Sequence, residues 1–432
     1  MDEMLKKQLQ VIAILMTVWI ANTFDTGILQ GKSSISCRLD PFSIAEKAKD
    51  ADIVDINSND VLWKESKEDE DEIPVYTLYY WNSQSKKTTV LYEGRDFLYA
   101  KIKNGMVAAV FRIIEMNEEG RNIHDVLKIR TMESDSAWQT IYESKIRYNQ
   151  IYTVEIQGTQ KDPLIYFYDA NWDIEEASFT KMLRWNKATG VKTLNDEKSY
   201  KYYMVFLGEK IFFADDRTGD LDIWVFDTKT EQARPIVQAP GDQFFSYDWE
   251  SSEVVGTRFI VWLDSLHEDE NEHYNYDIYG TDLASEKTFP IATSVNREDN
   301  PVVIGNTVYW LDTYFPPGID NKKIVPITKV MSLDYQTGLI KEMMTPKTYK
   351  TDLFANPGYL IWNEEVYSSI RKELTTDIRA YSFIMNACFS VCISEMEETV
   401  LYMNRNHIIW MTSQNGLYDP MNILSSDLIL SL

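Results

Sequence analysis

Carboxylates are the side chains of this sequence that offer the most chemistry. Asp and Glu number 67 among 432 residues, against 43 Lys and Arg, which gives a formal net charge of −24. Six acids recur at one place, two residues after an aromatic side chain that ends an apolar run: Glu65, Asp169, Asp215, Asp264, Asp312 and Glu364. Repeated carboxylates can attract a basic protein segment, bind calcium, or act as general acids and bases.

Motifs for catalysis are absent from the sequence. It has no Gly-x-Ser-x-Gly elbow, no His-Glu-x-x-His, no Cys-x-x-Cys and no Walker-type loop, which excludes the common hydrolase, zinc and nucleotide sites. Of the four histidines, His267 and His273 lie in one predicted loop, but their spacing is weak for a shared metal. We therefore predict no catalytic, metal-binding or cofactor-binding residue, and we lean towards a protein that is not an enzyme.

The three cysteines, Cys37, Cys388 and Cys392, are an odd number and give no disulfide framework. Cys388 and Cys392 are expected on one face of a strand, about 13 Å apart at the usual rise, which is too far for a bridge. Gly31 and Lys32 separate Cys37 from the apolar stretch near the N-terminus, which argues against a lipid anchor at this thiol.

The recurring acids belong to a repeat. Its centre is a short apolar run that ends in an aromatic residue, at intervals of 46 to 56 residues: 61–63, 109–111, 164–167, 211–213, 260–262, 308–310, 360–362 and 408–410. Such a period with β-type residues is typical of propeller blades. We predict that each run is the second strand of a blade and that its aromatic residue packs between neighbouring blades.

Turn signals divide each unit into four strands. Pairs such as Asn104-Gly105 precede the apolar run and suit a tight hairpin, since Gly and Asn tolerate positive φ. The third strand ends in an Asx-x-x-Ser/Thr turn, at 82–85, 186–189, 227–230, 282–285 and 334–337. Gly190 and Gly338 then supply a left-handed residue. The sequence therefore predicts an all-β fold, a closed β-propeller of eight four-stranded antiparallel blades; seven blades is the less favoured alternative.

Part of the repeat resembles a known family. The string Asn-Tyr-Asp-Ile-Tyr-Gly-Thr-Asp-Leu at 275–283, followed by Thr-Phe-Pro-Ile at 288–291, resembles the propeller repeat of TolB-like proteins and archaeal surface proteins. The hairpin at 302–312 is similar to the first hairpin of that repeat. The resemblance is good over about 241–346, and it implies a non-enzymatic propeller outside the cytoplasm that often serves protein contacts. It implies no particular partner, because such propellers host unrelated functions.

Charge narrows the range of partners. A net charge of −24 argues against binding nucleic acid or an anionic lipid surface. Acids also cluster in the predicted loops between second and third strands, at 67–72, 117–120, 215–220, 267–272 and 363–365. Three interpretations of these loops stay open: a contact surface for a basic partner, plain solvation of long hairpins, and bound Ca²⁺, although no loop has EF-hand spacing.

The N-terminus has the layout of an export signal. Lys6 and Lys7 precede an apolar stretch at 11–21, as in a signal peptide, and this stretch is short for a membrane-spanning helix. No clean Ala-x-Ala follows, so an uncleaved membrane anchor stays open. We predict an extracytoplasmic protein, secreted or membrane-anchored.

The predicted organisation has three parts. Residues 1–30 are a signal peptide or membrane anchor, 31–51 a linker and 52–432 the β-propeller. The segment from Ile44 to Ala51 is the one short amphipathic helix candidate. The last unit has the weakest third strand, so we expect a segment such as 33–39 to help close the ring.

These observations favour an exported, non-enzymatic propeller that acts as a protein-interaction module. Its acidic loop face would contact a protein of the cell envelope or the extracellular space. The alternative is binding or hydrolysis of a glycan or another small ligand in the central funnel. Residues 314–318, Tyr-Phe-Pro-Pro-Gly, are the best candidate for an aromatic loop tip that would serve a glycan.

Overall fold

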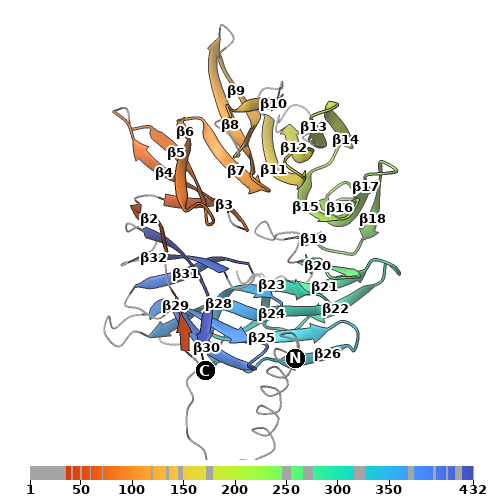
Figure 1. The fold of residues 1–432 in the computed structure, drawn as a ribbon. Helices are drawn as coiled ribbons and strands as arrows, with labels where there is room; N and C mark the ends of the chain where they lie inside the picture. Colours follow the sequence, from red (N-terminus) through yellow and green to blue (C-terminus); the bar gives the residue numbers. More distant parts are fainter. Residues whose placement is uncertain are drawn as a thin grey trace, which may run out of the picture. The chain divides into compact units, whose positions relative to one another are not determined.

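The computed structural model describes residues 36–39, 42–48, 51–58, 60–70, 72–117, 120–132, 136–144, 149–171, 179–245, 254–265, 276–315, 326–367, 374–392, 396–404, 407–413 and 421–431. Cys37–Ile429 form one compact unit, which holds eight sheets of four antiparallel strands (Figure 1). No helix within the described ranges is long and apolar enough to cross a membrane. The fold is all-β, and the predicted eight-bladed propeller is confirmed.

Each of the first seven blades consists of four strands that follow one another in the sequence. Blade 1 consists of β3 (Ala51–Asn57), β4 (Asp60–Glu68), β5 (Pro74–Asn82) and β6 (Lys87–Gly94), and blade 2 of β7 (Phe97–Lys103), β8 (Met106–Asn117), β9 (Gly120–Thr131) and β10 (Gln139–Glu143). Blade 3 consists of β11 (Asn149–Gly158), β12 (Pro163–Asn171), β13 (Phe179–Asn186) and β14 (Gly190–Asn195). Blade 4 consists of β15 (Lys201–Leu207), β16 (Lys210–Asp215), β17 (Asp222–Asp227) and β18 (Gln232–Val237).

The remaining blades follow the same order, except for the last. Blade 5 consists of β19 (Gln243–Phe244), β20 (Phe259–Asp264), β21 (Asp277–Asp282) and β22 (Thr288–Ala292). Blade 6 consists of β23 (Arg297–Ile304), β24 (Thr307–Tyr314), β25 (Ile327–Asp334) and β26 (Leu339–Glu342). Blade 7 consists of β27 (Tyr349–Asn356), β28 (Tyr359–Tyr367), β29 (Leu374–Ser382) and β30 (Ala387–Cys392). Blade 8 consists of β31 (Glu397–Asn404), β32 (His407–Ser413), β33 (Met421–Asp427) and β2 (Phe42–Ala48). A further pair, β1 (Ser36–Arg38) and β34 (Ile429–Ser431), forms a two-stranded sheet.

The predicted apolar runs form the second strands. The aromatic residues that end them are buried and expose at most 3% of their surface: Trp63, Phe111, Phe167, Phe213, Trp262, Trp310, Trp362 and Trp410. Trp262 lies in one apolar cluster with Val225 of blade 4 and Val308 of blade 6. Successive residues of a strand point to opposite faces, so adjacent buried residues mean that both faces are covered. The prediction that these aromatic residues pack between blades is confirmed.

The Asx turns also form as predicted. Asp282 accepts hydrogen bonds from the amides of Ala284 at 3.1 Å and Ser285 at 2.7 Å. Equivalent bonds are accepted by Asn82, Asn186, Asp227 and Asp334. The left-handed residue that follows is glycine in two turns, Gly190 with φ 72° and Gly338 with φ 68°. In the other three turns it is Lys86, Glu231 or Glu286, with φ between 52° and 56°.

The blades share two kinds of edge. One edge carries the loops between second and third strands and the links between blades, such as the link at 196–200; we call it the link face. The opposite edge carries the turns between first and second strands and between third and fourth strands, such as 104–105 and 83–86; we call it the turn face. Because every blade repeats the same strand order, each kind of loop recurs on its own side of the ring.

A strand from the N-terminal side of the chain closes the ring. β2 is the outer strand of blade 8, where Phe42 pairs with Ser425 of β33. Ile44 lies in one apolar cluster with Ile423 of blade 8 and Trp63 of blade 1. This strand therefore joins the last blade to the first.

The closing strand differs from three expectations. We expected 33–39 to close the ring, but β2 does so, and Ser36–Arg38 pairs with β34 instead. β2 also lies inside the predicted linker at 31–51 and replaces the helix expected from Ile44. The physical reason is that Phe42 and Ile44 stand two residues apart, at a strand period, with polar Ser43 between them. The open edge of β33 also needs backbone partners, which a strand supplies.

Candidate functional site

The six recurring acids lie where the second strands approach the link face. Four of them expose at most 5% of their surface: Asp169, Asp215, Asp264 and Glu364. The other two, Glu65 and Asp312, are half-buried. We expected acidic loops at 215–220 and 363–365, but Asp215 and Glu364 are interior groups, because the fold provides donors for them. Asp169 likewise accepts from the Tyr142 hydroxyl at 2.5 Å and from the Ser144 hydroxyl at 3.1 Å.

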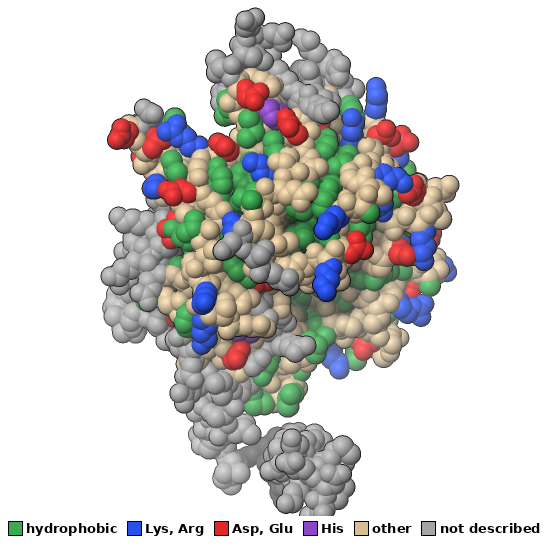
Figure 2. Space-filling view, turned by 45° about the horizontal axis from the view of Figure 1, so that its top comes forward, with side chains coloured by type: hydrophobic (Ala, Val, Ile, Leu, Met, Phe, Trp, Pro, Cys, Tyr) green, Lys and Arg blue, Asp and Glu red, His purple; other side chains and the backbone are tan. Residues whose placement is uncertain are grey.

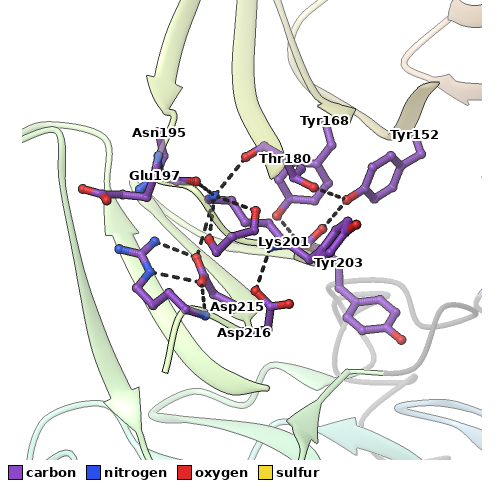
Figure 3. A network of polar contacts seen from close by, with 12 residues as sticks. Tyr152, Tyr168, Thr180, Asn195, Glu197, Lys201, Tyr203, Asp215 and Asp216 are labelled. Carbon is purple, nitrogen blue, oxygen red and sulfur yellow. Dashed lines mark hydrogen bonds and ion pairs between the residues drawn. The ribbon is translucent and has the colours of Figure 1, made fainter. Parts of the chain in front are cut away.

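Lys201, at the start of β15, is a fully buried charge near this face (Figure 3). Its Nζ atom donates to the carbonyl oxygens of Thr180 at 2.9 Å and Glu197 at 2.7 Å, and to the hydroxyl of Ser199 at 3.0 Å. The Asp215 carboxylate lies 3.9 Å away. Burial lowers the pKa of Lys201 to about 8, although Asp215 opposes part of this shift. Lys201 thus ties the link at 196–200 to both blade 3 and blade 4.

Asp215 is held from the other side by an arginine. Arg217 donates to the two carboxylate oxygens, through Nε at 3.0 Å and Nη2 at 2.6 Å, and its backbone amide donates at 3.0 Å. The guanidinium carbon lies 3.9 Å above the ring centre of Trp224. A carboxylate with a bidentate arginine and a buried ammonium nearby is compensated within the fold.

Two tyrosines of blade 3 extend the contact to blade 4 (Figure 3). The Tyr152 hydroxyl donates to the carbonyl oxygen of Lys201 at 2.5 Å, and the Tyr168 hydroxyl donates to that of Tyr203 at 2.7 Å. Burial raises the pKa of Tyr168 well above its usual range. The Tyr168 hydroxyl therefore stays protonated, and both hydroxyls donate to the first strand of the next blade.

The same arrangement recurs at Lys350, at the start of blade 7. Its Nζ donates to the carbonyl of Thr328 at 3.0 Å, to the hydroxyl of Thr348 at 3.0 Å and to the carbonyl of Pro346. Pro346 and Thr348 precede Lys350 by the same numbers of residues as Glu197 and Ser199 precede Lys201. Burial again lowers the pKa of the lysine to about 8. The repetition indicates a property of the fold rather than of one site.

Other residue types occupy the equivalent position in blades 5 and 6. The Gln243 side-chain amide donates to the carbonyls of Ala239 at 3.2 Å and Gly241 at 2.6 Å. Glu298 accepts from the amide of Ser294 at 2.8 Å, and burial raises its pKa to about 7. We call the set Lys201, Gln243, Glu298 and Lys350 the link clasp, since each member bonds to the backbone of the link that precedes it.

The lysines of the link clasp have little capacity for catalysis. An ammonium has three donors, and those of Lys201 meet four oxygen atoms of the surrounding backbone and Ser199. A lysine that serves as a base or nucleophile must instead present its lone pair to a substrate. We conclude that these buried charges fix the links between blades.

Sequence reasoning did not identify the link clasp, although a signal is present. Ser199-Tyr200-Lys201 and Thr348-Tyr349-Lys350 are matching tripeptides immediately before or at the start of first strands. In both, the hydroxyl two residues before the lysine is the one that it binds. A search for a repeat at the first strand, and not only at the second, would have found this pair.

The two described histidines lie in different blades, each beside a carboxylate. His124 Nε2 lies 3.3 Å from Glu143, and His407 Nδ1 lies 3.1 Å from Asp427. His267 and His273 lie outside the described residues. Within the part of the chain that the structure describes, no three His, Cys, Asp or Glu side chains are grouped to hold a metal ion.

Of the cysteines, the structure describes the thiol of Cys388, which is free and donates to the carbonyl of Met344 at 3.1 Å. Burial raises the pKa of this thiol to about 11, so it is protonated at neutral pH. The side chains of Cys37 and Cys392 lie outside the described residues. Cys388 therefore has none of the thiolate character of a reactive cysteine.

The predicted acidic loops differ from one another. Glu68, Glu70 and Glu72 are exposed on the loop between β4 and β5, whereas Glu364 is buried. The loop at 267–272, and residues 118–119 of the loop at 117–120, lie outside the described residues. On the face drawn in Figure 2, acidic and basic side chains are interspersed. The aromatic tip predicted at 314–318 is described only in part, with Tyr314 exposed by 48%.

The fold has similar solved structures, but no protein-family model and no curated protein sequence matches the chain. The chain is similar to the β-propeller domain of the Trilobed protease from Pyrococcus furiosus, with 11% identity, 80% of this chain and 99% of that chain covered, and a TM-score of 0.45. It is similar to TolB from Acinetobacter baumannii, with 11% identity, 86% and 81% coverage and a TM-score of 0.34. It is also similar to an oligogalacturonate lyase in complex with manganese, with 9% identity, 92% and 97% coverage and a TM-score of 0.42. At this level, similarity carries no argument about activity or partner.

The link clasp predicts a large effect of one substitution. Lys201→Met removes the hydrogen bonds from Nζ to Thr180, Glu197 and Ser199 and the cation beside Asp215. We expect the free energy of unfolding to fall by roughly 2–4 kcal/mol, measured by chemical denaturation. Lys198→Met is the matched control, because Lys198 is exposed in the same link, and it should change stability by less than about 0.5 kcal/mol. Equal effects of the two substitutions would contradict the role of Lys201.

Proposed function

We propose that this chain is an exported, non-enzymatic β-propeller that binds another protein of the cell envelope or the extracellular space. One observation carries the proposal. The buried charges of the link face form their bonds within the fold, whereas exposed acids gather in the loop between β4 and β5, whose base is fixed by bonds of its own. An active site would need ionisable groups that converge on an accessible substrate. The link clasp uses Lys201 and Lys350 for the backbone instead.

The loop between β4 and β5 is the described part of the acidic contact surface. Asp69 accepts from the amide of Ile73 at 3.1 Å and forms an ion pair with Arg95, so the base of the loop is fixed. Glu68, Glu70 and Glu72 are exposed around it. A fixed loop loses little conformational entropy on binding, and its carboxylates attract a basic partner over a distance.

Export is part of the proposal and rests on the sequence of residues 1–30. We expect that these residues, fused to a reporter that is active only outside the cytoplasm, give reporter activity, because a basic start and an apolar stretch direct secretion. Changing two apolar residues of the stretch to Lys should abolish the signal. A reporter that stays silent with the unchanged segment would refute export.

Charge reversal in the β4–β5 loop tests the contact surface. With Glu68, Glu70 and Glu72 changed to Lys, the fold should stay intact, since these side chains are exposed. Association with proteins captured from an envelope fraction should slow by at least tenfold at low salt, because rim charges act mainly on the association rate. Surface plasmon resonance at low and high salt measures this rate, and the difference should shrink at high salt.

A matched control changes three acids of the turn face, Asp162, Glu209 and Glu231, to Lys. This variant has the same net charge as the first and should associate as the parent does. If the two triple variants slow association equally, net charge and not the loop is responsible. If neither does, the acidic surface takes no part in binding.

A further inference from the structure

A pocket opens on the turn face between blades 1 and 2. Its volume is about 530 Å³, within the range of small-molecule sites. Blade 1 lines it with residues that include Asp60 and Tyr80, and blade 2 lines it with Asn104 and Gly105. Gln160, from the first turn of blade 3, completes the wall. The pocket is thus built from three blades and lies away from the acidic β4–β5 loop.

The polar side chains of the pocket are held in place by the turns. Asn82 donates to Asp60 at 2.8 Å and accepts from the amides of Gln84 at 3.1 Å and Ser85 at 3.0 Å. On the opposite wall, Asn104 donates to the carbonyl of Gly158 at 3.0 Å. Such bonds fix the amides before any ligand arrives, as in a preorganised site.

Asp60 is the central group of this wall. It exposes 8% of its surface, and its Oδ1 atom accepts from the hydroxyl of Tyr80 and from the amide of Asn82, both at 2.8 Å. Among the described residues, no side chain or amide donates to its Oδ2 atom. A carboxylate that is more than nine-tenths buried and has one oxygen without a donor is set to accept a hydrogen bond from a ligand.

The amides of the opposite wall add acceptors of the same kind. Gln160 donates through Nε2 to the carbonyl of Gly105 at 3.2 Å, and Asn104 donates through Nδ2 to Gly158. Within the described part of the chain, nothing donates to Gln160 Oε1 or Asn104 Oδ1. The pocket therefore offers several fixed acceptors, and the exposed amide of Gln84 adds a donor.

The charges and hydrogen-bonding groups that line the pocket limit the class of ligand that it can bind. The described lining contains one carboxylate, Asp60, and one ammonium, Lys87, so the pocket favours neither an anion nor a cation. A hydroxyl group donates one hydrogen bond and accepts others. Hydroxyls of a ligand therefore match this pocket, whose wall offers several acceptors and some amide donors. Met132 supplies an apolar contact beside them. We propose that this pocket binds a neutral saccharide of one or two units.

An array of neutral and anionic saccharides, probed with the whole chain, tests the proposal. We expect binding to at least one neutral saccharide, whose affinity is then measured by calorimetric titration. Asp60→Asn keeps an oxygen for Tyr80 and Asn82 but replaces the open acceptor by a donor, and it should weaken binding at least tenfold. Gln84→Ala removes only an exposed amide and should weaken binding several-fold without affecting folding.

Gln139→Ala is the matched control, because Gln139 is exposed on the outer strand of blade 2 and does not line the pocket. It should bind the saccharide as the parent does. The proposal is overturned if no neutral saccharide binds, if only anionic ones bind, or if Gln84→Ala and Gln139→Ala bind equally well. These outcomes are independent of the envelope partner, since the β4–β5 triple variant leaves this pocket unchanged.

Discussion

The blades of this protein depend on being covered on both faces. Leu62 and Trp63 are neighbours on a second strand, so they point to opposite faces, and both are buried. A single four-stranded sheet leaves such residues in water, and a row of sheets leaves two outer faces uncovered. Only a closed ring covers every blade. Ile44 belongs to the cluster that joins blades 8 and 1, and so it contributes to this closure.

Closure imposes a second requirement, because the links between blades bury backbone carbonyl groups at the link face. The link clasp meets this requirement with Lys201 and Lys350, and with a glutamine and a glutamate at the equivalent positions. Some of the charged residues that the composition suggested for the surface thus lie in the interior, where they bond to the links. Among the described residues, the exposed acidic loop of blade 1 and the polar pocket of the turn face are the two surfaces on which the binding proposals rest. The two proposals place a protein partner and a small ligand on separate surfaces of one ring.

Local features of the fold were predictable from the sequence, and long-range features were not. The apolar runs and the Asx turns follow from residues a few positions apart, and the structure confirms them. β2 pairs with a strand at the other end of the chain, and seven residues alone did not distinguish a strand from a helix. The positions of the recurring acids in the repeat were predicted from the sequence. Their burial was not, because composition does not show which acids lie in the interior. Asp215 is interior because Lys201 and Arg217, from different elements, meet it there.

The most direct test of this account compares two outer-strand residues by chemical denaturation. Ile44 of β2 exposes 7% of its surface and Val90 of β6 exposes 52%. If β2 closes the ring, Ile44→Ala should lower the free energy of unfolding by roughly 2–4 kcal/mol, as expected for a buried aliphatic side chain. Val90→Ala should lower it by less than about 1 kcal/mol. An Ile44→Ala protein as stable as the Val90→Ala protein would show that β2 is only a tether and would contradict closure through this strand.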